Sequence, residues 1–253
     1  MNADVNGLRL YYELSGHGDP LVLLHGGVGA SEMFGAMAES LGRRRRLIGV
    51  HLQGHGRTKD IDRPLTFESM ADDVAALVTE LGYEQADFLG YSLGGGVAVQ
   101  AAIRHPEQVR KLVAVSTVFK RLGFHPEVLA GMAQVGPESA RFMPDSPLGR
   151  LYPDVAWPSL FTKLGRLLAH DYDWGEQVAG IRAETMLAYA DADSIDPAHA
   201  VEFYRLLGGG LRDANQDGSG RTRNRLAIVP NATHYDMLTK PILTEAVLDF
   251  LAS

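Results

Sequence analysis

The chain has 253 residues, enough for one large domain or for one domain with an insertion. Its 24 basic and 31 acidic residues give a net charge of −7, which disfavours nucleic acid and anionic membranes as partners. Because there are no cysteines, disulfides, thiolate nucleophiles and cysteine metal sites are excluded.

The N-terminal sequence "MNADVNGLRL" lacks the cationic start and apolar core of a secretory signal. No apolar run approaches the roughly 18–20 residues that span a bilayer. We therefore expect a cytoplasmic protein with no membrane partner.

Strands and helices are predicted to alternate along the first half of the chain. Apolar runs predict strands at 8–14, 20–24, 46–52, 86–92 and 111–117, and helical spacing predicts helices at 31–42, 67–81 and 93–104. This alternation indicates an α/β fold with a mostly parallel sheet that helices cover on both faces.

Residues 120–180 interrupt the alternation, because they hold half of the 12 prolines, both tryptophans and only short helical patterns such as 159–169. We interpret this stretch as a helical cap inserted into a core formed by 1–119 and 181–253. The alternation resumes with strands at 184–190 and 225–230 and helices at about 197–207 and 241–252. The glycine-rich loop at 207–224 should lie at the N-terminal end of the last strand, away from the usual ligand edge.

One serine lies between a predicted strand and a predicted helix, in Gly90-Tyr91-Ser92-Leu93-Gly94. A tight strand-to-helix turn leaves no room for side chains two positions before and after the serine, and it exposes the hydroxyl at the sheet edge. A serine N-cap between packing glycines is the alternative.

A serine hydroxyl needs a base, and the base needs an orienting acid. His234 follows the last strand, in "VPNATHYDML", and the chain order of serine, acid and histidine is the one expected for this sheet architecture. His25 and His55 compete for the role of base, but they precede Ser92, and we interpret them as loop-shaping residues.

Three aspartates in "LAYADADSIDP" compete for the role of acid. Asp196 precedes Pro197, a pattern typical of a helix N-cap. Asp191 directly follows the strand, where the chain has little room to turn toward His234. Asp193 lies at the crown of the loop and is the chosen acid.

A tetrahedral oxyanion needs two N–H donors. The residue after the nucleophile, Leu93, supplies one of them. We assign the other to Gly27, in the "LLHGGVG" loop after an earlier strand.

From residue 5 onward the sequence resembles the α/β-hydrolase family, in its serine esterase or lactonase branch. The His25-Gly26-Gly27 loop, "LQGHGR", "GYSLGG", "ADAD" and "THYDML" carry the resemblance. It implies an eight-stranded sheet whose second strand is antiparallel, a cap after strand six, and an acid at Asp193. His51 stands where many relatives carry an acid, and Val28 replaces a proline common in iminopeptidases.

These features predict a serine hydrolase for esters or lactones of small, partly apolar compounds, with no metal or organic cofactor. The aromatic residues that could line an acyl pocket are Phe124, Phe142, Tyr152, Trp157 and Phe161. Phe142 and Trp157 are chosen from them, although for any single one packing of the cap onto the core is the favoured alternative. Carbon–carbon bond hydrolysis, peracid formation and a ligand-binding receptor on a hydrolase scaffold remain alternatives. A homo-oligomer is possible.

Overall fold

The computed structural model describes residues 1–253 and contains one eight-stranded sheet in the order β1-β2-β4-β3-β5-β6-β7-β8. β2 runs antiparallel to its neighbours β1 and β4, whereas the pairs from β4 through β8 are parallel. The eight-stranded sheet with an antiparallel second strand is therefore confirmed. The strands are β1 (Asn2–Val5), β2 (Leu8–Gly16), β3 (Asp19–Leu24), β4 (Arg45–His51), β5 (Ala86–Tyr91), β6 (Val109–Val115), β7 (Glu184–Ala192) and β8 (Arg225–Thr233).

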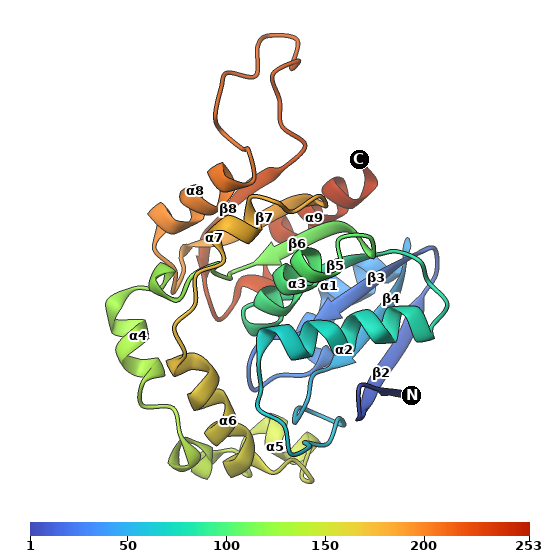
Figure 1. Cartoon of the computed structure of the whole chain (residues 1–253), viewed down its shortest axis with the longest axis vertical. Helices are drawn as coiled ribbons and strands as arrows, with labels where there is room; N and C mark the ends of the chain where they lie inside the picture. The colour runs from blue at the N-terminus through green and yellow to red at the C-terminus, as the bar shows by residue number, and fades with distance from the viewer.

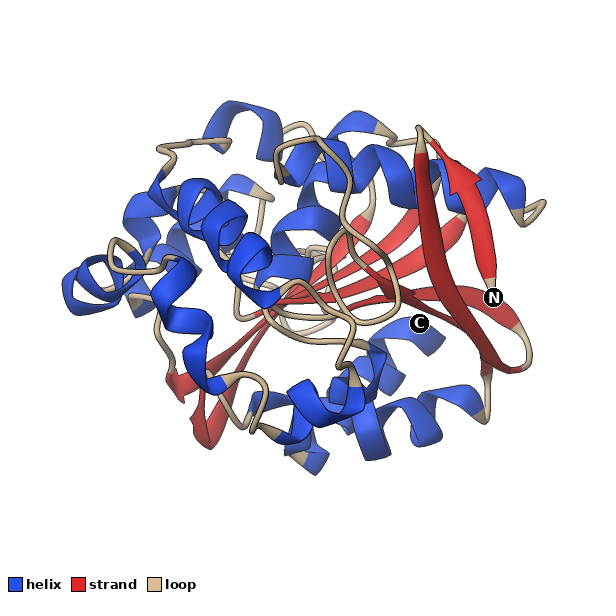
Figure 2. Cartoon of the chain, turned by 90° about the horizontal axis from the view of Figure 1, so that it is seen from below, coloured by secondary structure: helices blue, strands red, loops and turns tan.

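Helices cover both faces of the sheet, as Figure 2 shows. The α-helices are α1 (Gly35–Gly42), α2 (Phe67–Glu80), α3 (Leu93–Arg104), α4 (Pro126–Met132), α5 (Pro147–Leu151), α6 (Trp157–Ala169), α7 (Gly175–Val178), α8 (Pro197–Leu206) and α9 (Pro241–Ala252). Short 3₁₀ helices are η1 (Ser31–Phe34), η2 (Arg121–Gly123), η3 (Pro137–Phe142) and η4 (Met237–Thr239). The expected α/β class with a doubly covered sheet is confirmed.

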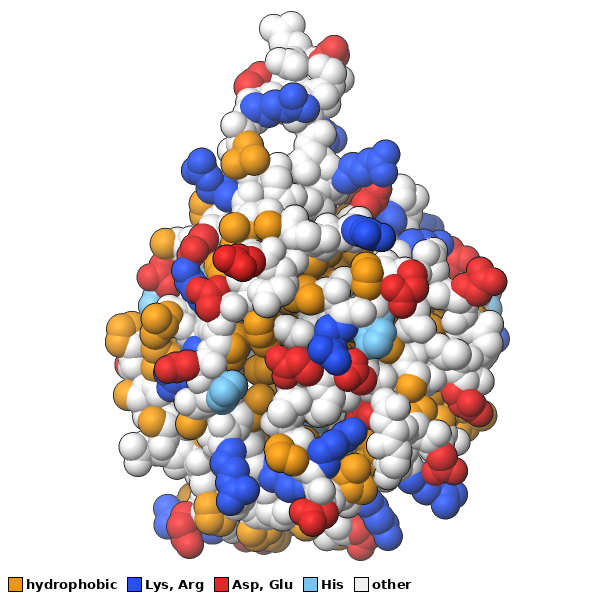
Figure 3. All heavy atoms as spheres, in the orientation of Figure 1, with side chains coloured by type: hydrophobic (Ala, Val, Ile, Leu, Met, Phe, Trp, Pro, Cys, Tyr) orange, Lys and Arg blue, Asp and Glu red, His pale blue; other side chains and the backbone are white.

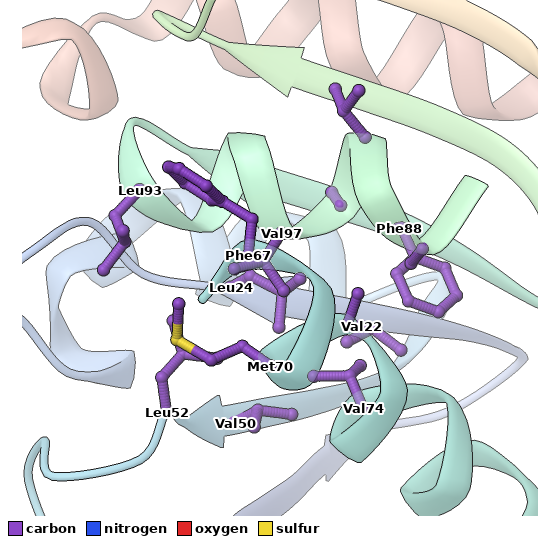
Figure 4. Packing of buried hydrophobic residues seen from close by; sticks show 14 of the residues in the cluster. Val22, Leu24, Val50, Leu52, Phe67, Met70, Val74, Phe88, Leu93 and Val97 are labelled. Atoms are coloured by element: carbon purple, nitrogen blue, oxygen red, sulfur yellow. The ribbon is translucent and has the colours of Figure 1, made fainter. Parts of the chain in front are cut away.

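The alternation of side chains along β3 divides the core into two layers. Leu21 and Leu23 pack in the layer under α1 and α9, whereas Val22 and Leu24 pack in the layer under α2 and α3. Figure 4 shows the second layer, where Phe67 lies beside Val97 and the strand residues. A strand buried on both faces explains why "PLVLL" is an uninterrupted apolar run.

Local sequence signals fix most of the helix boundaries. Thr66 caps α2 by accepting a hydrogen bond from the Ser69 N–H at 3.0 Å, and Gly82 follows α2 with φ +79°. The single helix expected at 31–42 is instead η1 followed by α1, because the chain turns at Gly35 with φ +37°. Strand β1 is absent from the sequence-based prediction.

The β6–β7 segment (residues 116–183) contains η2, η3 and α4 to α7. In Figure 1, α4, α5 and α6 lie together to one side, apart from the helices that cover the sheet. The segment between α8 and β8 projects from the body as a loop, and acidic and basic side chains are interspersed on the face shown in Figure 3. Every helix is too short or too polar to cross a lipid bilayer.

Candidate active site

The residues expected to carry chemistry meet at one edge of the sheet. Ser92 follows β5, Asp193 follows β7, and His234 follows β8. These three strands run in parallel within the sheet, so their C-terminal ends lie at the same edge. Parallel pairing thus brings together residues that are separated by up to 142 positions in the chain.

The turn at Ser92 has the strained backbone that a tight strand-to-helix connection requires. Ser92 has φ 52° and ψ −116°, a conformation that residues other than glycine rarely adopt. A Cβ at Gly90 would lie 2.1 Å from the Gly94 carbonyl oxygen, and one at Gly94 would lie 2.2 Å from the Leu24 carbonyl oxygen. Only glycine fits at these two positions, for the steric reason inferred from the sequence.

The Ser92 hydroxyl faces a histidine rather than its own helix. Ser92 occupies the N-cap position of α3, but its side chain makes no capping hydrogen bond. Its Oγ lies 3.0 Å from His234 Nε2, and His234 Nδ1 lies 2.8 Å from Asp193 Oδ1. Because an ionised carboxylate accepts but does not donate, Nδ1 carries the proton and Nε2 presents a lone pair to the serine. This geometry allows His234 to accept the proton of Ser92.

Asp193 is held as a carboxylate by four donors. Oδ1 accepts from His234 Nδ1 and the Ser194 N–H at 2.8 Å each, and Oδ2 accepts from Ser116 Oγ at 2.6 Å and the Ala190 N–H at 3.0 Å. Burial alone would raise the pKa of Asp193, but the hydrogen bonds from His234 and Ser116 outweigh it and lower the pKa. Ser116 was not identified from the sequence, although it directly follows β6 at the same sheet edge.

The two competing aspartates have other partners. Asp191 accepts hydrogen bonds from the N–H groups of Asn231 and Ala232 at 3.0 Å each, and so joins the ends of β7 and β8. Asp196 is the N-cap of α8 and accepts from the Ala198 N–H at 2.7 Å, as its position before a proline predicted. Neither contacts His234.

Two backbone N–H groups are available beside Ser92. Leu93 begins α3, so its N–H has no acceptor within the helix. The N–H of Gly27, in the loop after β3, donates no hydrogen bond within the protein. A Cβ at Gly27 would lie 3.9 Å from the Leu93 Cβ, which places the two residues side by side. Both are also part of the wall of the cavity described below.

His25 and His55 serve the loops, as interpreted from the sequence. His25 Nδ1 lies 2.8 Å from the Gly26 carbonyl oxygen, and its Nε2 accepts from the Leu52 N–H at 3.1 Å. His55 Nδ1 lies 2.9 Å from the Gln53 carbonyl oxygen, and burial lowers the pKa of His55 to about 4. Both rings are fully buried, and neither contacts Ser92.

A cavity of about 600 Å³ opens at Ser92 and His234. Its wall is mostly hydrophobic and comes from the sheet edge, from Met33 and Phe67, and from the β6–β7 segment, in which α4 and α6 contribute several apolar side chains. The residues of that segment that line it are Thr117, Arg121, Phe124, Glu127, Val128, Gly131, Met132, Val135, Phe161, Leu164, Leu167, Leu168 and Tyr172.

Phe142 and Trp157, the two residues chosen to line this cavity, do not line it. The Phe142 side chain is 67% exposed and lies beside the Arg141 guanidinium, 4.4 Å from carbon to ring centroid. Trp157 begins α6 and is buried in the larger of the two hydrophobic core clusters. Phe124 and Phe161 are the aromatic residues of this segment that do reach the cavity, together with Tyr172.

One further cluster brings together Glu13, Glu32 and His51, whose ligand atoms lie within 4.8 Å of one another. His51 Nδ1 accepts from the Arg57 N–H at 3.0 Å, so in the neutral ring Nε2 carries the proton, and it faces Ser31 Oγ at 2.9 Å. A cation would need the Nε2 lone pair, which this tautomer does not offer. The cluster therefore fits a hydrogen-bond network better than a metal site.

Comparison with known proteins agrees with this fold. A family model described as the alpha/beta hydrolase fold matches residues 19–135. The putative carbamate hydrolase RutD of Azorhizobium caulinodans is 28% identical over 265 residues, covering 95% of this chain and 94% of that protein. The pimeloyl-[acyl-carrier protein] methyl ester esterase of Yersinia enterocolitica is 37% identical over 134 residues, 50% of each chain. The crystal structure of the enol-lactonase from Burkholderia xenovorans LB400 matches with a TM-score of 0.78 at 22% identity and covers 100% of both chains, a likeness of fold.

Proposed function

Because this chain belongs to the α/β-hydrolase fold family, we propose that it is a serine hydrolase that forms an acyl-enzyme on Ser92. Its substrates are carboxylic esters or lactones of small, partly apolar compounds. The observation that carries the proposal is the 3.0 Å contact between Ser92 Oγ and His234 Nε2, on a strained turn that opens into an apolar cavity.

In the first step, Ser92 Oγ attacks the substrate carbonyl carbon while its proton moves to His234 Nε2. The carboxylate of Asp193 stabilises the imidazolium that forms and keeps the ring in the required tautomer. The N–H groups of Gly27 and Leu93 stabilise the oxyanion, which develops only during the reaction. The imidazolium then gives its proton to the departing alkoxide.

In the second step, water replaces the alcohol. His234 accepts a proton from this water, the hydroxide attacks the acyl carbon, and Ser92 Oγ leaves with the proton returned by the imidazolium. The named substrates of the relatives, a carbamate, a methyl ester and an enol-lactone, share a carbonyl carbon bonded to a heteroatom leaving group. The proposal extends this bond class to the present chain.

We further propose that residues 120–180 act as a cap that shapes the acyl pocket. Val128 and Met132 of α4 and Phe161 and Leu164 of α6 line the cavity. These positions are apolar and lie opposite the sheet edge that holds Ser92, so they are suited to bind an acyl chain while the sheet edge performs the chemistry.

The test compares wild type with Ser92→Ala on p-nitrophenyl acetate and butyrate, a γ-lactone and a 1,3-diketone. We expect multiple turnovers of the esters by wild type, loss of turnover in Ser92→Ala, and a melting temperature that changes little. A fluorophosphonate probe should label Ser92, identified by peptide mass spectrometry. Activity of Ser92→Ala within tenfold of wild type would refute the nucleophile, a single turnover would favour the receptor alternative, and cleavage of the diketone alone would favour carbon–carbon hydrolysis.

A further inference from the structure

One arginine lines the mostly hydrophobic cavity of the candidate site. Arg121 lies in η2, just beyond β6, and its side chain is only 18% exposed. A guanidinium stays charged at every physiological pH. Placing a permanent charge against apolar walls costs free energy unless a partner compensates it.

The hydrogen-bond acceptors and carboxylates of the protein compensate the charge of Arg121 only in part. Arg121 Nε donates to the Leu168 carbonyl oxygen at 2.8 Å, and one terminal nitrogen lies 3.4 Å from Asp171 Oδ1. The Asp171 side chain is 87% exposed, so this ion pair is long and solvated and contributes little. The second terminal nitrogen of Arg121 has no partner.

Other partly buried arginines in this protein differ in this respect. Arg45 lies 3.0 Å from the buried Asp87, and Arg63 lies 2.5 Å from the buried Asp73. Each of them therefore has a buried carboxylate within ion-pair distance. Arg121 lacks one and faces a cavity large enough to admit one from outside.

A second donor without a partner belongs to Tyr172, whose backbone is hydrogen-bonded to that of Arg121. The Arg121 N–H bonds to the Tyr172 carbonyl oxygen at 3.0 Å, and Tyr172 also lines the cavity. The Tyr172 hydroxyl makes no hydrogen bond within the protein. Burial raises the pKa of Tyr172 and the charge of Arg121 opposes that rise, so the hydroxyl remains a protonated donor. The residues that line the cavity thus include two hydrogen-bond donors that have no acceptor within the protein.

We propose that the cavity binds an acyl group that carries a carboxylate at its far end, and that Arg121 is the residue that selects this carboxylate. The carboxylate would accept from the free side of the guanidinium and from the Tyr172 hydroxyl, while the methylene chain lies along α4 and α6. The substrate class is then monoesters of linear dicarboxylic acids. This inference rests on the proposed function, because it places the scissile ester at Ser92.

The other ionised group of the cavity wall has the opposite sign. Glu127 is exposed in the first turn of α4 and forms no ion pair with Arg121. It would repel an anionic substrate weakly through solvent. Removing the charge of Arg121 should therefore lower the preference for a carboxylate substrate, whereas removing the charge of Glu127 should raise it.

The experiment compares two matched substrate series. One contains the mono-p-nitrophenyl esters of adipic, suberic and sebacic acids, and the other contains the same esters with the far carboxylate replaced by a carboxamide. Wild type should favour the carboxylate at its preferred length by roughly 10- to 100-fold in kcat/KM, the range of a charged hydrogen-bonded pair. Most of the difference should appear in KM, because the contact is remote from the reacting atoms.

Arg121→Gln should bring this ratio close to one, and Arg121→Lys should retain part of it. Glu127→Gln should keep or raise the ratio. Arg166→Gln, which removes an exposed cation of α6 that does not line this cavity, is the matched control and should leave the ratio unchanged. Melting temperatures of all four variants show whether each one folds.

The outcomes separate the two proposals. A ratio near one in wild type at every chain length overturns the carboxylate site while leaving ester hydrolysis intact, and so does a wild-type ratio that persists in a folded Arg121→Gln protein. If wild type cleaves neither series and Ser92 resists the fluorophosphonate, the proposed function fails and the carboxylate site fails with it.

Discussion

Replacing Asp193 by asparagine tests the proposed role of its carboxylate, because it exchanges one carboxylate oxygen for an amide nitrogen. Asp193 accepts four hydrogen bonds, from His234 and Ser194 on one oxygen and from Ser116 and Ala190 on the other. Asparagine has a single oxygen, so its amide nitrogen must face a backbone N–H in either orientation. Both orientations therefore place two donors against each other at a buried site.

The orientation decides how the activity is lost. If the amide nitrogen faces His234, the ring must change tautomer and Nε2 then donates to Ser92 instead of accepting its proton. If the amide oxygen faces His234, the tautomer survives but the negative charge that stabilises the imidazolium is gone. We expect kcat to fall by roughly 10³- to 10⁴-fold, about 4–5.5 kcal/mol in the activation free energy, with a modest change in KM.

The assay is steady-state hydrolysis of p-nitrophenyl butyrate, with urea unfolding to verify that the variant folds. Asp191→Asn and Asp196→Asn are the controls, because their carboxylates contact backbone N–H groups away from His234. Both controls should keep kcat within about twofold, with any effect appearing in stability. A folded Asp193→Asn enzyme that retains a tenth of the wild-type kcat, or an inactive Asp191→Asn enzyme, would refute the reasoning.

Three further predictions concern packing, pH and the cavity. Gly94→Ala should lower the free energy of unfolding by at least about 2 kcal/mol, because its Cβ would lie 2.2 Å from a backbone oxygen, whereas Gly131→Ala in α4, with open space around the Cβ, should be neutral or stabilising. Between pH 7 and pH 4 the free energy of unfolding should fall, because the unfolded chain protonates His55 at its ordinary pKa of about 6.5 and the folded chain only at about 4. This difference in pKa contributes at most roughly 3 kcal/mol. His55→Gln should flatten the dependence of the unfolding free energy on pH in urea titrations, and an unchanged dependence would contradict the prediction. Phe161→Ala, which enlarges the cavity, should shift the kcat/KM profile of p-nitrophenyl esters toward longer acyl chains; Trp157→Ala should affect stability instead, and the reverse pattern would contradict the cavity described here.

Much of the candidate site was predictable because it depends on short-range sterics and on one rule of sheet geometry. A Cβ at Gly90 would clash with the Gly94 carbonyl oxygen, four positions away in the chain, whereas a Cβ at Gly94 would clash with the Leu24 carbonyl oxygen at the end of β3. His234 and Asp193 were placed correctly beside each other because both follow parallel strands, whose C-terminal ends share an edge. The N-cap role of Asp196 was likewise readable from the proline that follows it.

Other features were decided only by the folded chain. Strand β1 is four residues long and has an exposed–buried alternation too short to identify in the sequence, so its place is set by pairing with β2. Ser116 becomes a partner of Asp193 because β6 lies next to β7, a contact between positions 77 residues apart.

The β6–β7 segment shows most clearly which features the sequence alone could not predict. Its aromatic content predicted a pocket wall, and Phe124 and Phe161 do line the cavity. Phe142 is exposed and Trp157 is buried elsewhere, and the sequence did not single out Arg121 as a lining residue. Local sequence determines a helix end because the interacting atoms are neighbours in the chain. Which side chains of an irregular segment face a cavity depends on how short helices pack against distant elements, and only the tertiary structure determines that packing.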